Sequence, residues 1–190
     1  MATVSKFTKE LEGANMFILA DLEATCWENH NMPDYNEVIE IGFIVCNVRG
    51  DVLASYESFV KPVINPKLSK FCKKLTGIKQ KQVQSAKLLK DVVIDMTAWF
   101  EKDFAMDLRK VTWASWGDWD PLCLSRDCER HEIESPFGKH LNLQQLYADL
   151  RDVTTNLQDA VEREGGTWIG PRHRALSDAS NSMTVARVLI

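Results

Sequence analysis

The chain lacks the features of several protein classes. It has five cysteines in 190 residues, an odd number with no Cys-x-x-Cys pair, which argues against both a disulfide framework and a structural zinc site. No apolar run approaches 18 residues, and residues 1–15 contain no signal-peptide apolar region. We therefore expect a protein of the reducing cytoplasm, with no membrane partner.

The chain also lacks an excess of positive charge, because its net charge is −4. A protein that coats nucleic acid without sequence preference is usually basic, so this class is disfavoured. A nuclease is still compatible, since metal-binding carboxylates add negative charge that dications neutralise. The length predicts one domain, which we place at residues 16–190 after a polar N-terminal extension at residues 1–15.

Hydrophobic periodicity predicts an α/β fold, with helices on the faces of a sheet. A hairpin turn is predicted at Gly50, so the second and third strands should pair antiparallel. The element at 142–150 begins as either helix or strand. The predicted strands are 17–21, 38–48, 52–60 and 111–116, and the predicted helices are 68–75 (ended at Gly77), 85–104, 121–130, 157–164 and a last one capped by Ser177.

The most informative feature is a carboxylate pair at the end of the first predicted strand. Asp21 and Glu23 are two residues apart, so a strand places both side chains on one face. Like charges this close raise each other's pKa and are tolerated best when a hard dication lies between them. A single pair of this kind is more often a solvated sheet edge. Its meaning depends on partners elsewhere in the chain.

Two further motifs supply candidate partners. Trp119-Asp120 follows a short apolar segment, and His173 is followed five residues later by Asp178. The order of these motifs resembles the DEDDh group of 3'-to-5' exonucleases. Segments 21–26 (DLEATC) and 36–42 (NEVIEIG) resemble its Eri-type subgroup, whose members trim the 3' ends of RNA. The resemblance extends from about residue 16 to residue 190.

The resemblance implies a fold, a cofactor and a mechanism. The fold would be ribonuclease H-like, a mixed sheet of about five strands flanked by helices. Asp21, Glu23 and Asp178 would be metal ligands, with Asp120 as the fourth acidic residue. Two Mg²⁺ ions, with Mn²⁺ as an alternative, suit such oxygen ligands and promote phosphodiester hydrolysis. His173 would be the general base, because neutral imidazole accepts a proton near neutral pH.

Local spacing places the last two of these residues on different elements. Five residues of helix would leave the side chains of His173 and Asp178 about 140° apart. We therefore place His173 on the approach loop and Asp178 in the first turn of the last helix. In mid-chain, Asp120 fits the aromatic-Asp pattern better than Asp118, which we interpret as a cap or turn residue.

Several residues are candidates for contact with the substrate. By resemblance, Ala24 and Thr25 lie beside the 3' end, and Arg172 and Arg174 flank the proposed base and suit phosphate. For Trp27, stacking on a base and burial in the core both remain open.

The remaining aromatic, basic and histidine residues receive structural interpretations. Trp116 and Trp119 are assigned to the core, and Glu40 to a structural role near the site. The basic stretch at residues 67–81 is interpreted as a solvated face in preference to a nucleic-acid contact. The histidines outside the motif are taken as surface or structural residues: His30, His131 and His140.

The end of the chain departs from the family pattern. Asn181 fits its usual position after the last aspartate, but Met183-Thr184 stands where a small residue and arginine are usual. The pair Ala186-Arg187 comes later, so the role of Arg187 is left open.

We therefore expect a metal-dependent 3'-to-5' exoribonuclease that trims single-stranded RNA to nucleoside 5'-monophosphates. One alternative is an exonuclease acting mainly on single-stranded DNA, because the catalytic carboxylates do not touch the 2'-oxygen. Another is a non-catalytic, nucleic-acid-binding regulatory module, although all four acidic residues and the histidine are present.

Overall fold

The structure is a computed structural model that describes residues 5–28 and 36–190. His30 and the first four residues of the expected extension lie outside this range. The elements, in chain order, are α1 (Lys6–Glu10), β1 (Met16–Ala24), β2 (Val38–Asn47), β3 (Val52–Phe59), α2 (Lys70–Thr76), α3 (Gln80–Gln84), α4 (Leu89–Phe104), the 3₁₀ turn η2 (Leu108–Lys110), β4 (Trp113–Ser115), α5 (Trp119–Arg130), β5 (His140–Asn142), α6 (Leu143–Arg151), α7 (Leu157–Arg163) and α8 (Ala175–Leu189).

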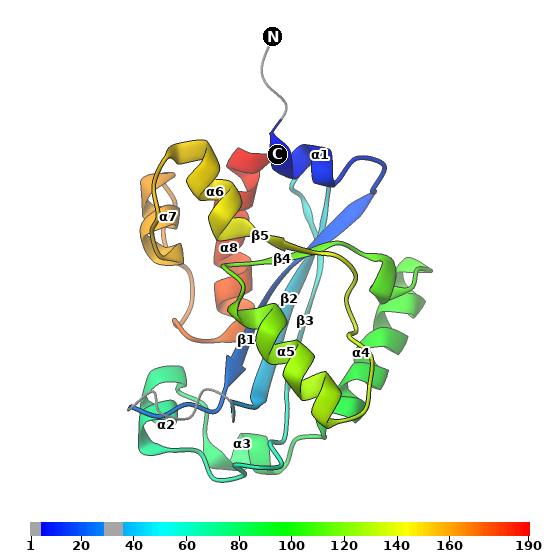
Figure 1. Cartoon of the computed structure of the whole chain (residues 1–190), viewed down its shortest axis with the longest axis vertical. Coiled ribbons are helices and arrows are strands. Elements are labelled where there is room, and N and C mark those ends of the chain that lie inside the picture. The colour runs from blue at the N-terminus through cyan, green and yellow to red at the C-terminus, as the bar shows by residue number, and fades with distance from the viewer. Residues whose placement is uncertain (1–4, 29–35) are drawn as a thin grey trace.

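The strands form one mixed five-stranded sheet in the order β3-β2-β1-β4-β5. β1, β2 and β3 pair antiparallel, whereas β4 and β5 run parallel to β1. Figure 1 shows β1 and β2 in the middle of the molecule, as expected for strands that are apolar on both faces. The predicted mixed sheet flanked by helices is confirmed.

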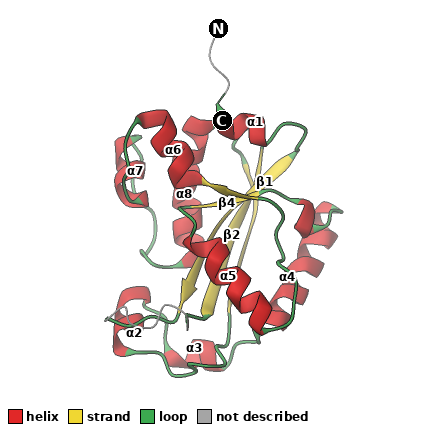
Figure 2. Cartoon of the chain, viewed as in Figure 1, coloured by secondary structure: helices red, strands yellow, loops and turns green. Residues whose placement is uncertain are grey.

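Helices cover both faces of the sheet (Figure 2). On one face, Ile18, Leu22 and Phe43 pack against the apolar sides of α4 and α5. On the other face, Leu19 and Ile44 pack against α6, α7 and α8. Alternate residues of β1 therefore serve two cores, and the face that carries Leu19 also carries Asp21 and Glu23. Among the described residues, no helix combines the length and apolar composition that crossing a bilayer requires.

Several boundaries differ from the sequence prediction. The helix predicted from residue 85 begins at Leu89, because Lys87 is held in extended backbone by a bridge to Val60. Ser177 does not cap the last helix: α8 begins at Ala175, whose N–H donates to the Glu40 carboxylate at 3.0 Å. The Ser177 hydroxyl instead donates to the Ile169 carbonyl at 2.9 Å.

The segment expected to be a polar extension contains α1. Phe7, only 1% exposed, contacts Phe17 of β1 edge to face, with 5.4 Å between the ring centroids. Ser5 caps the helix, and its hydroxyl also donates to the Leu189 carbonyl. Residues 5–11 thus pack on the same core as α8.

Candidate active site

The strand pairing places four positions of β1 and β2 next to one another on one face of the sheet. In the antiparallel register of β1 and β2, Asp21 lies opposite Gly42, and Glu23 lies opposite Glu40. Directly opposed side chains share a face. Three carboxylates and one empty position therefore line the end of β1 on the side that α8 covers.

The empty position at Gly42 lets α8 approach closely. A Cβ atom at Gly42 would lie 2.1 Å from the backbone nitrogen of Leu176 and 2.4 Å from the carbonyl carbon of Ala175. The first turn of α8 thus rests directly on β2. Asp178 lies in that turn, as predicted, and comes to face the β1 carboxylates.

Three of the predicted residues meet at this contact. Potential ligand atoms of Glu23, His173 and Asp178 all lie within 4.8 Å of one another. His173 precedes α8, as predicted, with a left-handed φ of 55°. The loop and the helix therefore deliver their side chains to one point, although 150 residues separate Glu23 from His173 in the chain.

An ion pair fixes the start of α8. The Glu40 carboxylate, only 1% exposed, accepts the Arg174 Nε–H at 3.0 Å and its Nη2–H at 2.6 Å, besides the Ala175 N–H. Arg174 also lies over the Phe59 ring. The structural role expected for Glu40 is thereby defined. Arg174, predicted to contact phosphate, instead forms an ion pair with Glu40 of the same chain.

The fourth acidic residue arrives from α5. Asp120, 4% exposed, accepts the Leu22 N–H at 3.0 Å. Leu22 lies between Asp21 and Glu23 in β1, so this hydrogen bond holds the Asp120 carboxylate beside those two residues. The Ser115 hydroxyl also hydrogen-bonds Asp120 and lies 2.9 Å from His140 Nε2. Asp118 instead occupies the N-cap of α5, with an exposed side chain that caps no backbone N–H.

Burial and mutual repulsion favour the protonated forms of these acids. Desolvation and the carboxylates of Asp120 and Glu23 raise the pKa of Asp21 well above its ordinary value. Burial and the Asp178 carboxylate raise the pKa of Glu23 to about 9. Burial also raises the pKa of Asp120 to about 7, against hydrogen bonds that lower it, and that of Asp178 to about 6. A cation is the group that would stabilise the four charges together.

His173 experiences the opposite effect. Partial burial and the neighbouring Arg172 guanidinium lower the pKa of its imidazole. These effects favour the neutral ring, which has a lone pair available to accept a proton.

The donor set fits a divalent metal ion. Carboxylate oxygens predominate, as hard dications require. Asp178 Oδ1 is shielded from solvent and has no hydrogen-bond partner among the described residues. A buried acceptor without a donor is costly unless another group satisfies it. The ordered set of acids and this unsatisfied oxygen both match a metal centre.

The predicted substrate contacts are distributed around the cluster. Ala24 and Thr25 are 4% and 2% exposed, and the Thr25 N–H donates to the Glu37 carbonyl at 2.9 Å. Trp27 is half-buried and Arg172 is exposed beside His173.

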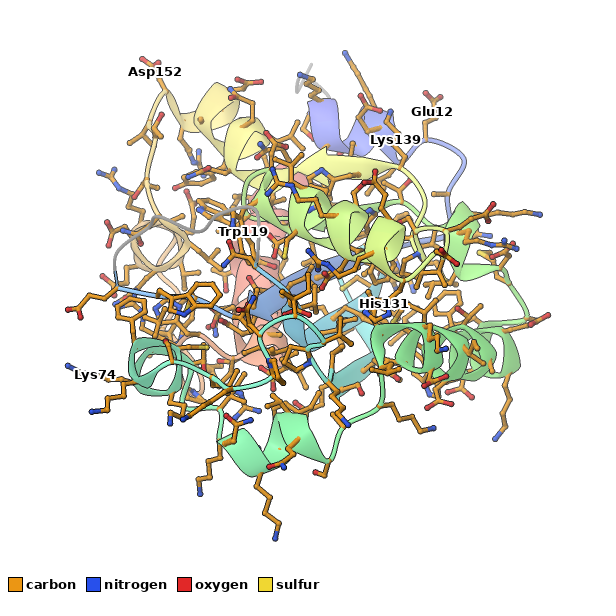
Figure 3. All side chains as sticks on the ribbon, turned by 60° about the horizontal axis from the view of Figure 1, so that its bottom comes forward. Glu12, Lys74, Trp119, His131, Lys139 and Asp152 are labelled. Atoms are coloured by element: carbon orange, nitrogen blue, oxygen red, sulfur yellow. The ribbon has the colours of Figure 1, made fainter. Side chains whose placement is uncertain are left out.

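The assignment of Trp119 to the core is wrong. Its side chain is 48% exposed because Trp119 is the first residue of α5 and only Asp120 turns inward. Figure 3 labels Trp119 beside α5, of which it is the first residue. Trp116 is half-buried and packs near Tyr147, as the core assignment predicted.

Sequence reasoning missed the supporting contacts. Nothing local marks Glu40 as the partner of Arg174, or Ser115 and His140 as neighbours of Asp120. Gly42 offered one signal, since a glycine within an otherwise apolar central strand indicates close approach of another backbone.

Comparison with known proteins places the chain among nucleases. The model of the exonuclease family RNase_T matches residues 18–186. The chain is 29% identical over 185 residues to the 3'-5' exonuclease Snipper of Drosophila melanogaster, covering 86% of this chain and 65% of Snipper. It is 28% identical over 193 residues to human ERI1 exoribonuclease 2, covering 91% of this chain and 28% of the relative.

Solved structures agree with this placement. The nuclease domain of 3'hExo, a DEDDh family member bound to rAMP, matches with a TM-score of 0.84 and 27% identity. The match covers 92% of this chain and 91% of that domain. The chain thus spans nearly all of a nuclease domain, but less than two thirds of the Snipper and ERI1 relatives.

Proposed function

The chain belongs to the exonuclease (RNase_T) family, and from this premise we propose that it is a metal-dependent 3'-to-5' exoribonuclease. Its substrate would be single-stranded RNA, and its products nucleoside 5'-monophosphates. The observation that carries the proposal is the meeting of Glu23, His173 and Asp178 within 4.8 Å, beside the buried Asp120. A structural role alone does not require four mutually repelling acids at one sheet end.

The proposed roles follow from the contacts. Asp21, Glu23, Asp120 and Asp178 would hold Mg²⁺, in the form of two ions, or Mn²⁺ in their place. Bound dications would acidify a water molecule and offset charge on the scissile phosphate. His173 would accept the proton of the attacking water, because burial and Arg172 lower the pKa of its imidazole and favour the neutral form that accepts a proton.

The surroundings suit a nucleotide at the 3' end. Exposed Trp119 adjoins Asp120 and offers an indole face on which any base can stack. Arg172, exposed beside His173, provides a guanidinium for phosphate. The relatives' names favour RNA, since one is an exoribonuclease and the 3'hExo domain was crystallised with rAMP. The cysteine pattern supports a reducing, cytoplasmic location as part of the same proposal.

The test is digestion of 5'-labelled single-stranded RNA and DNA of matched sequence with Mg²⁺, beside an Asp21→Asn variant. We expect a ladder that shortens from the 3' end, faster on RNA, and absent in the variant. Equal rates would replace the RNA preference with a general exonuclease activity. No ladder on either substrate with Mg²⁺ or Mn²⁺ would refute the proposal and favour a binding module.

A further inference from the structure

Charge is divided unevenly along this chain. Residues 58–90 contain nine lysines and no arginine, aspartate or glutamate. Since the whole chain has a net charge of −4 and this stretch contributes +9, the remaining residues carry −13. Gathering one sign of charge in a single segment disfavours the free protein through self-repulsion. An anion bound there would offset that cost.

The centre of this stretch folds as one unit, which we call the lysine lobe (residues 61–84, with α2 and α3). Its own small core packs on Ile39 of β2 and consists of Leu68, Cys72, Ile78 and Val83. All seven lysines of the lobe are exposed. Across residues 5–28 and 36–190, no salt bridge engages any of them, whereas Lys87, just beyond the lobe, pairs with Asp95.

The first turn of α2 is hydrogen-bonded to the residues at the end of β1. The Ser69 hydroxyl donates to the Cys26 carbonyl at 2.6 Å, and the Cys72 thiol donates to the Ala24 carbonyl at 3.6 Å. Ala24 directly follows Glu23 of the carboxylate cluster. The first turn of α2 is thus fixed beside the proposed active site, at the lower end of the sheet in Figure 1.

Polar side chains hold the backbone of the lobe at residues 63–68. The Glu37 carboxylate, in a residue only 2% exposed, accepts the N–H groups of Val63, Ile64 and Asn65 at 2.5, 2.8 and 2.6 Å. The Gln80 side chain bonds the Leu68 N–H and the Pro66 carbonyl. The lysines therefore stand on a backbone that is fixed in place before any ligand arrives.

The lysines on α2 share one side of the helix. Lys70, Lys73 and Lys74 are spaced three and four residues apart, the spacing that brings side chains to one face. Figure 3 shows Lys74 extending outward from α2. Flexible ammonium groups of this kind neutralise phosphates without reading bases.

We propose that the lysine lobe binds the phosphodiester backbone of the substrate strand, on the 5' side of the nucleotide being removed. The inference rests on the proposed exonuclease function. An RNA strand whose 3' end enters the carboxylate cluster of the protein is repelled by those carboxylates. Positive charge close by would offset this repulsion, and the lysine lobe supplies such charge. The lobe thereby sets the affinity for long strands, while the carboxylates act on the last linkage.

The test compares two triple variants with equal loss of charge. The lobe variant carries Lys70→Gln, Lys73→Gln and Lys74→Gln. The control variant carries Lys9→Gln, Lys102→Gln and Lys110→Gln, at exposed lysines on α1, α4 and η2 that form no salt bridge in the described structure. Cleavage is measured on a trinucleotide and a 20-nucleotide RNA with the same 3' sequence. Binding of the 20-nucleotide RNA is measured from 50 to 300 mM KCl with Asp21→Asn added to each protein.

We expect the lobe variant to lose about tenfold in kcat/KM on the long RNA and less than twofold on the trinucleotide. The slope of log K against log salt should decrease by about 0.7 for each phosphate that the lobe no longer neutralises, or about 2 for three. The control variant should resemble the wild type.

Two results would overturn the inference: an unchanged salt slope, which would assign the lobe to another anionic partner, or equal losses in both triple variants. The proposed function has a separate outcome. RNA binding that weakens only in the lobe variant, in a protein that cleaves nothing, would refute the exonuclease and keep the lobe as a nucleic-acid surface.

Discussion

Gly42→Ala should disable the site while leaving its functional side chains intact. The added Cβ would lie 2.1 Å from the Leu176 nitrogen, whereas ordinary contact begins at 3.4 Å, so the first turn of α8 must retreat by about 1.3 Å. The three nearest atoms are all backbone atoms of Ala175 and Leu176, so no side-chain rotation can relieve the contact. Asp178 moves with that turn, away from Glu23. A displacement near 1 Å can cost about 100-fold in rate.

The expected result is a fall of about 100-fold in kcat, with a loss of stability of about 1–3 kcal/mol from overpacking. Gly138→Ala is the matched control, because its Cβ would lie 2.7 Å from the Arg109 carbonyl oxygen, outside the site. It should lose stability and keep kcat within about threefold. Both are measured by steady-state kinetics and thermal unfolding. A folded Gly42→Ala protein with near-normal kcat would refute the proposed packing constraint.

Three further predictions concern charge, positioning and stacking. Because the pKa of Glu23 rises to about 9 and that of Asp120 to about 7, the folded chain keeps protons that the unfolded chain releases near pH 4. In EDTA the melting temperature should therefore fall as pH rises from about 5 to 9, and Mg²⁺ in excess of the EDTA should restore most of the lost melting temperature. A melting temperature that rises with pH in EDTA would contradict the assignment. Arg174→Ala should lower kcat and stability by leaving Glu40 buried and unpaired, with partial rescue by Arg174→Lys; a change confined to KM would instead indicate phosphate binding. Trp119→Ala should raise KM about tenfold with little effect on thermal unfolding, and Trp119→Phe should recover part of the loss; an unchanged KM would exclude stacking.

The sequence was most informative where a local pattern determines local structure. Alternation and apolar runs located β1 to β4 but not the short edge strand β5, and Gly77 marks the end of α2 with a left-handed C-cap, as predicted. The distance of five residues between His173 and Asp178 separated loop from helix correctly. These features depend on neighbours in the chain, so residue order is sufficient to find them.

Contacts between distant segments were not readable in this way. The sequence misplaces the start of α8, because the N-terminus of this helix is satisfied by Glu40, 135 residues earlier, in place of a local cap. The sequence suggests a phosphate contact for Arg174, because no nearby residue in the chain identifies Glu40 as its partner. The sequence suggests a core position for Trp119, because a tryptophan is usually buried, and only the geometry of α5 decides which of Trp119 and Asp120 faces inward.

The most direct test of the account is the rate at which Asp120→Asn and Asp118→Asn release the 3'-terminal nucleotide from labelled RNA with Mg²⁺. The two aspartates are two residues apart in the chain, but Asp120 is buried and accepts the Leu22 N–H, whereas Asp118 is exposed. The account predicts loss of activity by at least about 100-fold in Asp120→Asn and a rate near wild type in Asp118→Asn. Full activity in Asp120→Asn, or loss in Asp118→Asn alone, would contradict it.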